Sequence, residues 1–151
     1  MSWDDAKRYA SWAGLRLPSE AELEYATRAG TTTARFWGSG PRDRSACEYA
    51  NVPIWCRGYA NNAPVGRFAA NPFGLHDMLG NVLEWTADCW NDTYIGARKN
   101  GSAWTDGDCE QGVVRGGYVL GRHGDLRAAD RSSTYSWDKG NGLGLRPART
   151  L

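Results

Sequence analysis

The first fourteen residues alternate between apolar and polar positions in the manner of an amphipathic helix. Small or apolar side chains recur at the i, i+3, i+4, i+7 spacing that places them on one helix face. They are Ala6, Tyr9, Ala10 and Ala13. Ser2 is of a residue type that caps a first turn, and Gly14 is of a type that ends a last turn. The pattern predicts a helix between Ser2 and Gly14.

A second helix is indicated by a capping box. Ser19 is followed three positions later by Glu22, and in such a pair each side chain accepts a hydrogen bond from a backbone N–H that the first helical turn leaves without a partner. The predicted helix runs from Glu20 to Ala29. Gly30 follows it and supplies the left-handed backbone that ends many helices.

From Thr31 onward the helical period is lost, and turn residues separate short apolar pieces. The pieces at 64–68, 112–115 and 142–146 predict short strands. Two helices followed by short antiparallel strands and long loops are typical of an α+β fold, not of an alternating βα fold. At 151 residues we expect one domain spanning residues 1–151.

Charge and hydropathy exclude several classes of protein. The chain has 18 basic and 17 acidic residues and a net charge of +1, so we expect no nucleic-acid partner that needs a broad cationic surface. No stretch approaches the ~18 consecutive apolar residues of a membrane span. The first residues do not resemble a signal peptide, so we expect a soluble protein, and its localisation stays open.

The four cysteines are Cys47, Cys56, Cys89 and Cys109. They form no CxxC pair, so a zinc ribbon is not expected. They are either four thiols or two disulfides, and full pairing allows three arrangements. The local arrangement joins Cys47 to Cys56 and Cys89 to Cys109.

Three stretches together resemble the formylglycine-generating-enzyme/sulfatase-modifying family. They are LRLPSEAELEYA at 15–26, NPFGLHDMLGNVLEW at 71–85, and VRGG at 114–117 followed by LRAA at 126–129 and GLR at 144–146. The resemblance covers nearly the whole chain. It implies the C-type-lectin-like fold of that family, although a fold alone does not imply a function.

The chemistry of the family's oxidases is expected to be absent. In those enzymes two cysteine thiolates a few residues after the Gly-Gly motif bind copper, and thiolates are soft ligands that suit Cu(I). Here no cysteine lies between Gly117 and Arg146. Iron-dependent relatives use three histidines, whereas this chain has only His76 and His123. We therefore expect no enzyme and neither copper nor iron; the alternative is an oxidase or iron-dependent enzyme domain that lacks its usual catalytic cysteines.

The resemblance also implies a structural calcium site. Its ligands would be the carboxylates of Asp77 and Glu84 and the main-chain oxygens of Gly80 and Val82. Ca²⁺ takes 6–8 oxygen ligands of this mixed kind. The other interpretation is that both carboxylates only accept hydrogen bonds from the backbone of a tight loop.

The segment at 118–142 departs from the family's usual pattern and resembles the variable proteins of diversity-generating retroelements. In those systems the adenines of Asn codons are randomised. The residues at 118–125 and 132–136 all belong to the set that an AAC codon can then encode. Their mixture of Tyr, Ser, Gly, Asp and Arg is also typical of antibody-like binding surfaces. The alternative is drift in a surface loop.

These observations predict a ligand-binding protein whose partner is a protein or other macromolecule. Trp85, Trp90 and Trp12 are expected in the core, whereas Trp137 lies among polar turn residues and is expected to contact the ligand. Tyr, Trp and Arg should supply most of the binding energy. The predicted ligand-binding residues are Tyr118, Leu120, Arg122, His123, Asp125, Ser132, Thr134, Tyr135, Trp137, Asp138 and Asn141.

Overall fold

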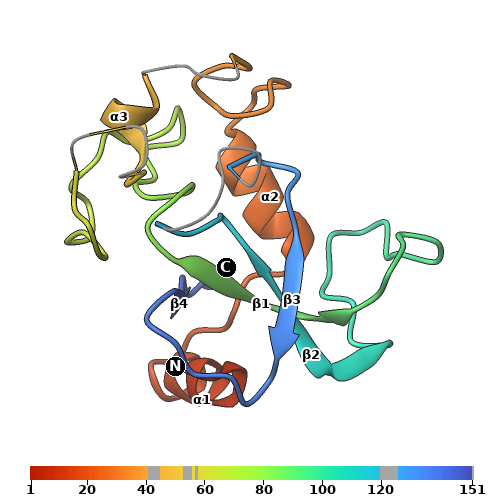
Figure 1. Cartoon of the computed structure of the whole chain (residues 1–151). Coiled ribbons are helices and arrows are strands. Elements are labelled where there is room, and N and C mark those ends of the chain that lie inside the picture. Colours follow the sequence, from red (N-terminus) through yellow and green to blue (C-terminus); the bar gives the residue numbers. More distant parts are fainter. Residues whose placement is uncertain (41–44, 53–55, 57, 120–125, 151) are drawn as a thin grey trace. The chain divides into compact units, whose positions relative to one another are not determined.

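The structure is a computed structural model that describes residues 1–40, 45–52, 56, 58–119 and 126–150. Its contacts divide the chain into two compact units. The first unit comprises residues 1–23, 84–115 and 131–151, and the second comprises residues 24–83 and 116–130. Figure 1 shows the helices and strands in chain order. The single domain over residues 1–151 stays a prediction.

Helix α1 runs from Trp3 to Trp12 and confirms the first predicted helix. Ser2 caps it with a reciprocal pair of hydrogen bonds: the Ser2 hydroxyl accepts from the Asp5 N–H, and the Asp5 carboxylate accepts from the Ser2 N–H. The acidic residue of this capping box satisfies a second backbone donor of the first turn. Gly14, with φ of 68°, follows the end of the helix.

Helix α2 runs from Glu20 to Arg28, and its predicted capping box is present. The Glu22 N–H donates to the Ser19 hydroxyl at 3.1 Å, and the Ser19 N–H donates to the Glu22 carboxylate at 2.8 Å. The helix ends one residue earlier than predicted, because Ala29 already has a positive φ of 48°, before Gly30 at 85°.

Both disulfides have the local arrangement. Cys47 is joined to Cys56, and Cys89 to Cys109. The first bridge holds helix α3, Ala46–Tyr49, which is a single turn and too short to show a period in the sequence. The second bridge joins strand β1, Leu83–Trp90, to strand β2, Asp108–Arg115. All four cysteines lie in the described part of the chain, and none of them is a free thiol.

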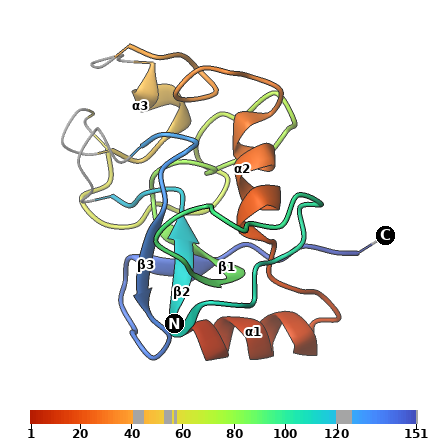
Figure 2. The ribbon, with the colours of Figure 1, turned by 90° about the vertical axis from the view of Figure 1, so that its right-hand side faces the viewer.

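Four strands form one sheet in the order β3-β2-β1-β4. They are β1 Leu83–Trp90, β2 Asp108–Arg115, β3 Ser132–Tyr135 and β4 Leu143–Leu145. β2 is antiparallel to both β1 and β3, and Figure 2 shows β2 and β3 side by side with opposite directions. The α+β class is confirmed.

The strand predictions were correct at 112–115 and 142–146, which fall on β2 and β4. The prediction at 64–68 was wrong: these residues form a turn in which Val65 is 89% exposed and Gly66 has φ of 74°. A short apolar piece without a partner strand buries no face and gains no ladder hydrogen bonds. Within the described ranges, no helix is long and apolar enough to cross a membrane.

The core of the first unit is built on two tryptophans. Trp85 and Trp3 stack with ring centroids 6.3 Å apart, and Trp85 is fully buried. The Trp3 indole donates to the Thr86 carbonyl at 2.7 Å. Trp85 confirms its predicted core position. Trp12 does not: it is 82% exposed, because it lies against Tyr9 and away from the buried face of α1, which carries Trp3, Ala6 and Ala10.

Candidate ligand-binding site

Two aromatic side chains stack on each other at the surface of the first unit. Tyr135 ends β3, and Trp137 lies in the turn that follows. Their ring centroids are 4.7 Å apart, with an interplanar angle of 11°. Tyr135 is 49% exposed and Trp137 is 59% exposed. We call this pair the aromatic platform; that Trp137 contacts a ligand stays a prediction.

Main-chain hydrogen bonds hold the turn that carries the platform. The Ser136 N–H donates to the Glu110 carbonyl at 2.8 Å, and the Ser136 carbonyl accepts from the Trp3 N–H at 3.0 Å. The Asp138 N–H donates back to the Tyr135 carbonyl at 2.9 Å. The turn is thus bound to β2 and to the start of α1 by groups that every residue other than proline carries.

A charged pair adds a further link between this turn and α1. The Lys139 ammonium lies 3.0 Å from the Asp5 carboxylate. This pairing, together with hydrogen bonds from Ser2, lowers the pKa of Asp5 from 3.8 to about 2. The ionised form of Asp5 therefore stabilises the fold above the pKa of the unfolded chain, and this contribution is lost as the pH falls toward about 2.

Replacing Lys139 with Met is expected to raise the pKa of Asp5 toward 3.8, because the largest cause of its depression is removed. An NMR titration of the Asp5 carboxyl carbon measures this change. Lys7→Met is the matched control, since the Lys7 ammonium pairs with Asp4 at 3.3 Å. An Asp5 midpoint that is the same in Lys139→Met and in the unaltered protein would contradict the pairing.

Strand register divides the predicted β3 residues between two faces. Tyr135 is the partner of Gln111, and Thr134 is the partner of Gly112. A side chain at Gly112 would meet the rings of Trp85 and Trp3, so Thr134 lies on the core side, where its hydroxyl donates to Asp138. Tyr135 lies on the opposite face with Ser133, because side chains alternate along a strand. Ser132 and Asn141 are exposed.

The other half of the predicted surface is described only in part. Tyr118 is half-buried and lies in the second unit. Leu120, Arg122, His123 and Asp125 lie outside the described residues.

A buried charge cluster that was not predicted from the sequence lies in the first unit. The Glu20 carboxylate accepts hydrogen bonds from Arg115 at 2.9 and 3.2 Å and from Arg131 at 2.8 and 3.1 Å. The Tyr94 hydroxyl donates to the same carboxylate at 2.6 Å. The side chains of Glu20 and Arg115 are only 8% and 3% exposed. An arginine beside the valines of a buried strand was the available signal, since such a residue needs a partner.

A second carboxylate lies beside this cluster. Asp88 accepts from the N–H groups of Glu20 and Trp104, both at 2.7 Å. Burial raises the pKa of Asp88, and the negative charge of Glu20 raises it further. Burial likewise raises the pKa of Tyr94, with a contribution from its hydrogen bond to Glu20. Two arginines and two carboxylates thus balance in charge, which is the arrangement expected of a structural network.

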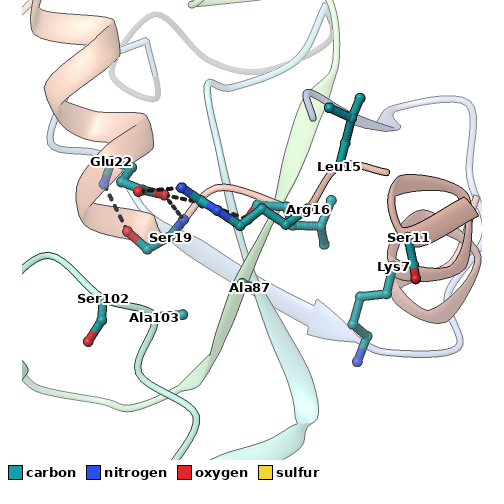
Figure 3. A pocket seen from close by; sticks show the side chains of 10 residues that line it. Lys7, Ser11, Leu15, Arg16, Ser19, Glu22, Ala87, Ser102 and Ala103 are labelled. Carbon is teal, nitrogen blue, oxygen red and sulfur yellow. Dashed lines mark hydrogen bonds and ion pairs between the residues drawn. The ribbon is translucent and has the colours of Figure 1, made fainter. Parts of the chain in front are cut away.

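A pocket opens between α1, the segment that leads to α2, and β1; the residues that line it all belong to the first unit (Figure 3). Its volume is about 570 Å³. Leu15, Leu17 and Ala87 give it apolar walls, and Arg16 pairs with Glu22 through two hydrogen bonds of 2.6 and 2.8 Å. This pairing lowers the pKa of Glu22 and raises that of Arg16. The Arg16 charge is therefore already compensated within the protein.

The predicted calcium ligands differ in what they contact. Asp77 has one carboxylate oxygen that accepts from the Gly66 N–H at 2.6 Å, whereas its other oxygen is buried with no hydrogen-bond partner in the described part of the chain. Gly80 and Val82 lie in the same unit as Asp77, and Glu84 lies in the other unit. Both Glu84 oxygens accept from Arg146, at 2.8 and 3.0 Å. Among described residues, no three His, Cys, Asp or Glu side chains gather into a metal cluster.

The fold and the motifs define a known class of protein. The family model of the sulfatase-modifying factor enzyme 1-like domain matches residues 1–151. The chain belongs to this family, as the motifs at 15–26, 71–85 and 114–146 predicted.

Relatives and solved structures of known name are similar to the chain. It is 36% identical to the formylglycine-generating enzyme of Streptomyces coelicolor over 98% of its own length and 51% of that protein. It is 46% identical to the enzyme of the same name from Thermomonospora curvata, over 60% of its own length and 33% of that protein. The chain thus spans about a third to a half of these relatives.

Among solved structures, PvdO from Pseudomonas aeruginosa aligns with a TM-score of 0.90 and 37% identity, over 100% of this chain and 60% of that one. Treponema denticola variable protein 1 aligns with a TM-score of 0.68 and 24% identity, over 87% of this chain and 46% of that one. The second likeness shows a shared fold. Together the two structures agree with the predicted α+β fold of the formylglycine-generating-enzyme type.

The prediction that the protein is not an enzyme was also wrong. We expected a protein that is not an enzyme, because the cysteine pair after the Gly-Gly motif is missing. Relatives at 36–46% identity are named as formylglycine-generating enzymes, so the family resemblance points to an enzyme. The missing cysteines concern one mechanism and do not decide whether the protein is catalytic.

Proposed function

We propose that this chain is the ligand-recognition part of an enzyme of the formylglycine-generating-enzyme family, and that it binds a macromolecule through the aromatic platform. The single observation that carries the proposal is the stacked, half-exposed pair of Tyr135 and Trp137 on a turn fixed by main-chain hydrogen bonds. Stacked aromatic rings lose little conformational entropy on binding and present a large contact area.

The arrangement of the cysteines supports a recognition role for this part of the enzyme. Copper chemistry of the thiolate type needs two sulfurs that are free to bind the metal. All four cysteines of this chain are joined in disulfides. The platform and the polar side chains beside it on β3 are at least partly exposed and can contact a ligand.

Replacing both platform residues with Ala is expected to weaken ligand binding by about 30-fold or more, because one aromatic hot spot contributes ~2 kcal/mol or more. The probes are peptides selected from a displayed library of random 12-residue sequences and a panel of immobilised polysaccharides. Binding is measured by biolayer interferometry. The melting temperature should change little, because both side chains are about half-exposed.

The chain supplies a matched control for this experiment. Tyr9 and Trp12 form another exposed aromatic pair, with ring centroids 5.8 Å apart, on the outer face of α1. Tyr9→Ala/Trp12→Ala should bind every selected probe as the unaltered protein does. The proposal fails if no probe binds the unaltered protein, or if the platform variant binds as tightly as the control.

A second candidate is a variable protein diversified by a retroelement. It is favoured by residues 132–136, which carry the platform and belong entirely to the set reached by adenine-directed change of Asn codons. Sequencing the DNA beside the gene tests it. A near-identical copy of the 3′ end that differs only at adenines, next to a reverse transcriptase gene, would establish this candidate, and the lack of such a copy would dismiss it.

Calcium at the Asp77 loop is supported by the buried Asp77 oxygen that has no partner. Asp77 would bind the ion with the carbonyls of Gly80 and Val82, and the ion would fix an irregular backbone. Glu84 fits this role less well, because Arg146 occupies both of its oxygens. Millimolar Ca²⁺ is expected to raise the melting temperature by mass action, and Mg²⁺ should not.

Asp77→Asn tests the assignment, since Asn tolerates the positive φ of 59° at this position but removes the charge. This variant should lose the Ca²⁺ response. Elemental analysis of the purified protein should find neither copper nor iron in stoichiometric amount. An equal rise in melting temperature in Asp77→Asn would refute a site at this loop.

A further inference from the structure

A hollow of about 360 Å³ lies in the first unit, where β1 ends and β2 begins. This volume is at the lower end of the ~300–1,000 Å³ range of small-molecule pockets. One aromatic ring and four polar side chains line it. They are Trp90, Asn91, Asp92, Asp108 and Gln111.

Gln111 connects this hollow to the aromatic platform. It lines the hollow, and it is the cross-strand partner of Tyr135, so the two side chains leave the sheet on the same face about 5 Å apart at Cβ. The Gln111 amide donates to the Asp108 carboxylate at 2.9 Å, and its oxygen accepts from the Ser133 hydroxyl at 2.8 Å. The hollow and the platform are therefore two ends of one polar and aromatic band.

The ring in the hollow is held in a fixed orientation. The Trp90 indole donates to the Asp92 carboxylate at 2.8 Å. The Arg131 guanidinium lies over the Trp90 ring, 4.1 Å from its centroid, and is itself fixed by its hydrogen bonds to Glu20. A ring that is already ordered loses little entropy when a ligand stacks on it.

The side chains of the band offer oriented acceptors for the hydroxyl groups of a ligand. Lys139 at the platform is paired with Asp5, and Asp138 accepts from Thr134. Between the hollow and the platform lie the amide of Gln111 and the hydroxyl of Ser133. Asp92 and Asp108 already accept from neutral donors, and a carboxylate has about four acceptor positions, so each can accept further from hydroxyl groups.

We propose that this band binds a glycan, with one sugar ring in the hollow at Trp90 and another on the aromatic platform. Sugar rings combine a flat C–H face, which packs on Trp and Tyr, with hydroxyls that donate to oriented carboxylates and amides. The inference rests on the proposed function and names the class of ligand that the platform takes.

Saturation-transfer NMR and calorimetry with cellohexaose, mannohexaose and chitohexaose test the inference. At least one of these neutral hexasaccharides is expected to bind, with enhanced transfer to the ring protons that face the aromatic residues. Asp108→Asn should weaken its binding about tenfold or more, because hydrogen bonds to charged groups contribute ~1.5–3 kcal/mol. Asp106→Asn is the matched control, since Asp106 is exposed, pairs with Arg98 and does not line the hollow.

The outcomes separate this inference from the proposed function. Peptides that bind the platform while no hexasaccharide binds would overturn the glycan assignment and leave the recognition role intact. A decalysine peptide that binds the hollow in place of the sugars, with loss in Asp108→Asn, would also overturn it. Equal hexasaccharide binding by Asp108→Asn and Asp106→Asn would show that the hollow is not part of the site.

Discussion

Replacing Glu20 with Gln is expected to lower the free energy of unfolding by about 3–5 kcal/mol, since removing one partner of a buried ion pair leaves an uncompensated charge. Here one carboxylate serves two arginines, and the Arg115 side chain is only 3% exposed. The Gln side chain keeps a carbonyl oxygen but loses the negative charge that contacts both guanidinium groups. Urea denaturation measures the change, and the melting temperature should fall by on the order of 10 °C.

Glu22→Gln is the matched control, two residues along the same helix. Glu22 also pairs with an arginine, Arg16, but its side chain is 44% exposed, and exposed pairs contribute about 0–1 kcal/mol. The two variants remove the same charge from the same helix. A loss at Glu20 no larger than that at Glu22 would mean that water reaches the cluster.

Replacing Gly112 with Val is expected to destabilise the first unit by about 3 kcal/mol, because extra atoms in a packed core force rings and backbone apart. A Cβ at Gly112 would lie 2.8 Å from the Trp85 ring and 2.9 Å from the Trp3 ring. Neither ring can move freely, since the Trp3 indole donates to the Thr86 carbonyl and the Trp85 indole donates to the Met1 carbonyl.

The graded variant Gly112→Ala should lose about half as much stability, measured by the same urea denaturation. Gly140→Ala serves as the control: the nearest atom to a Cβ there is 4.0 Å away, so its loss should stay within ~0.5 kcal/mol of zero. If Gly112→Val were as stable as Gly140→Ala, the stacked tryptophans would have to shift at little cost, which would contradict their close packing.

The two helices could be predicted from the sequence because their signals are local. Ser19 and Glu22 meet within one turn, and the Ala6 and Ala10 face needs no distant partner to be visible. β3 could not be predicted, because its four residues acquire strand geometry only by pairing with β2. The turn at 64–68 shows the converse: its apolar residues predicted a strand, but without a partner strand they form a turn.

The exposed position of Trp137 could be expected from the sequence because it stands among turn residues without a core period, and its contact with a ligand stays a prediction. The positions of Gln111 and Trp90 could not be expected, since only the register of β2 and the end of β1 bring them toward Tyr135. The role of Glu20 was hidden for the same reason: its partners Arg115 and Arg131 lie 95 and 111 positions away.

The main-chain bonds of Ser136 also affect how this protein can evolve. Because the turn is held through the N–H and carbonyl of Ser136 and through the Trp3 N–H, these bonds do not depend on the side chains of Tyr135 and Trp137. Substitutions at Tyr135 and Trp137 can therefore accumulate without loss of the fold, one residue at a time. The same property would make the turn a suitable place to build a combinatorial library on this scaffold.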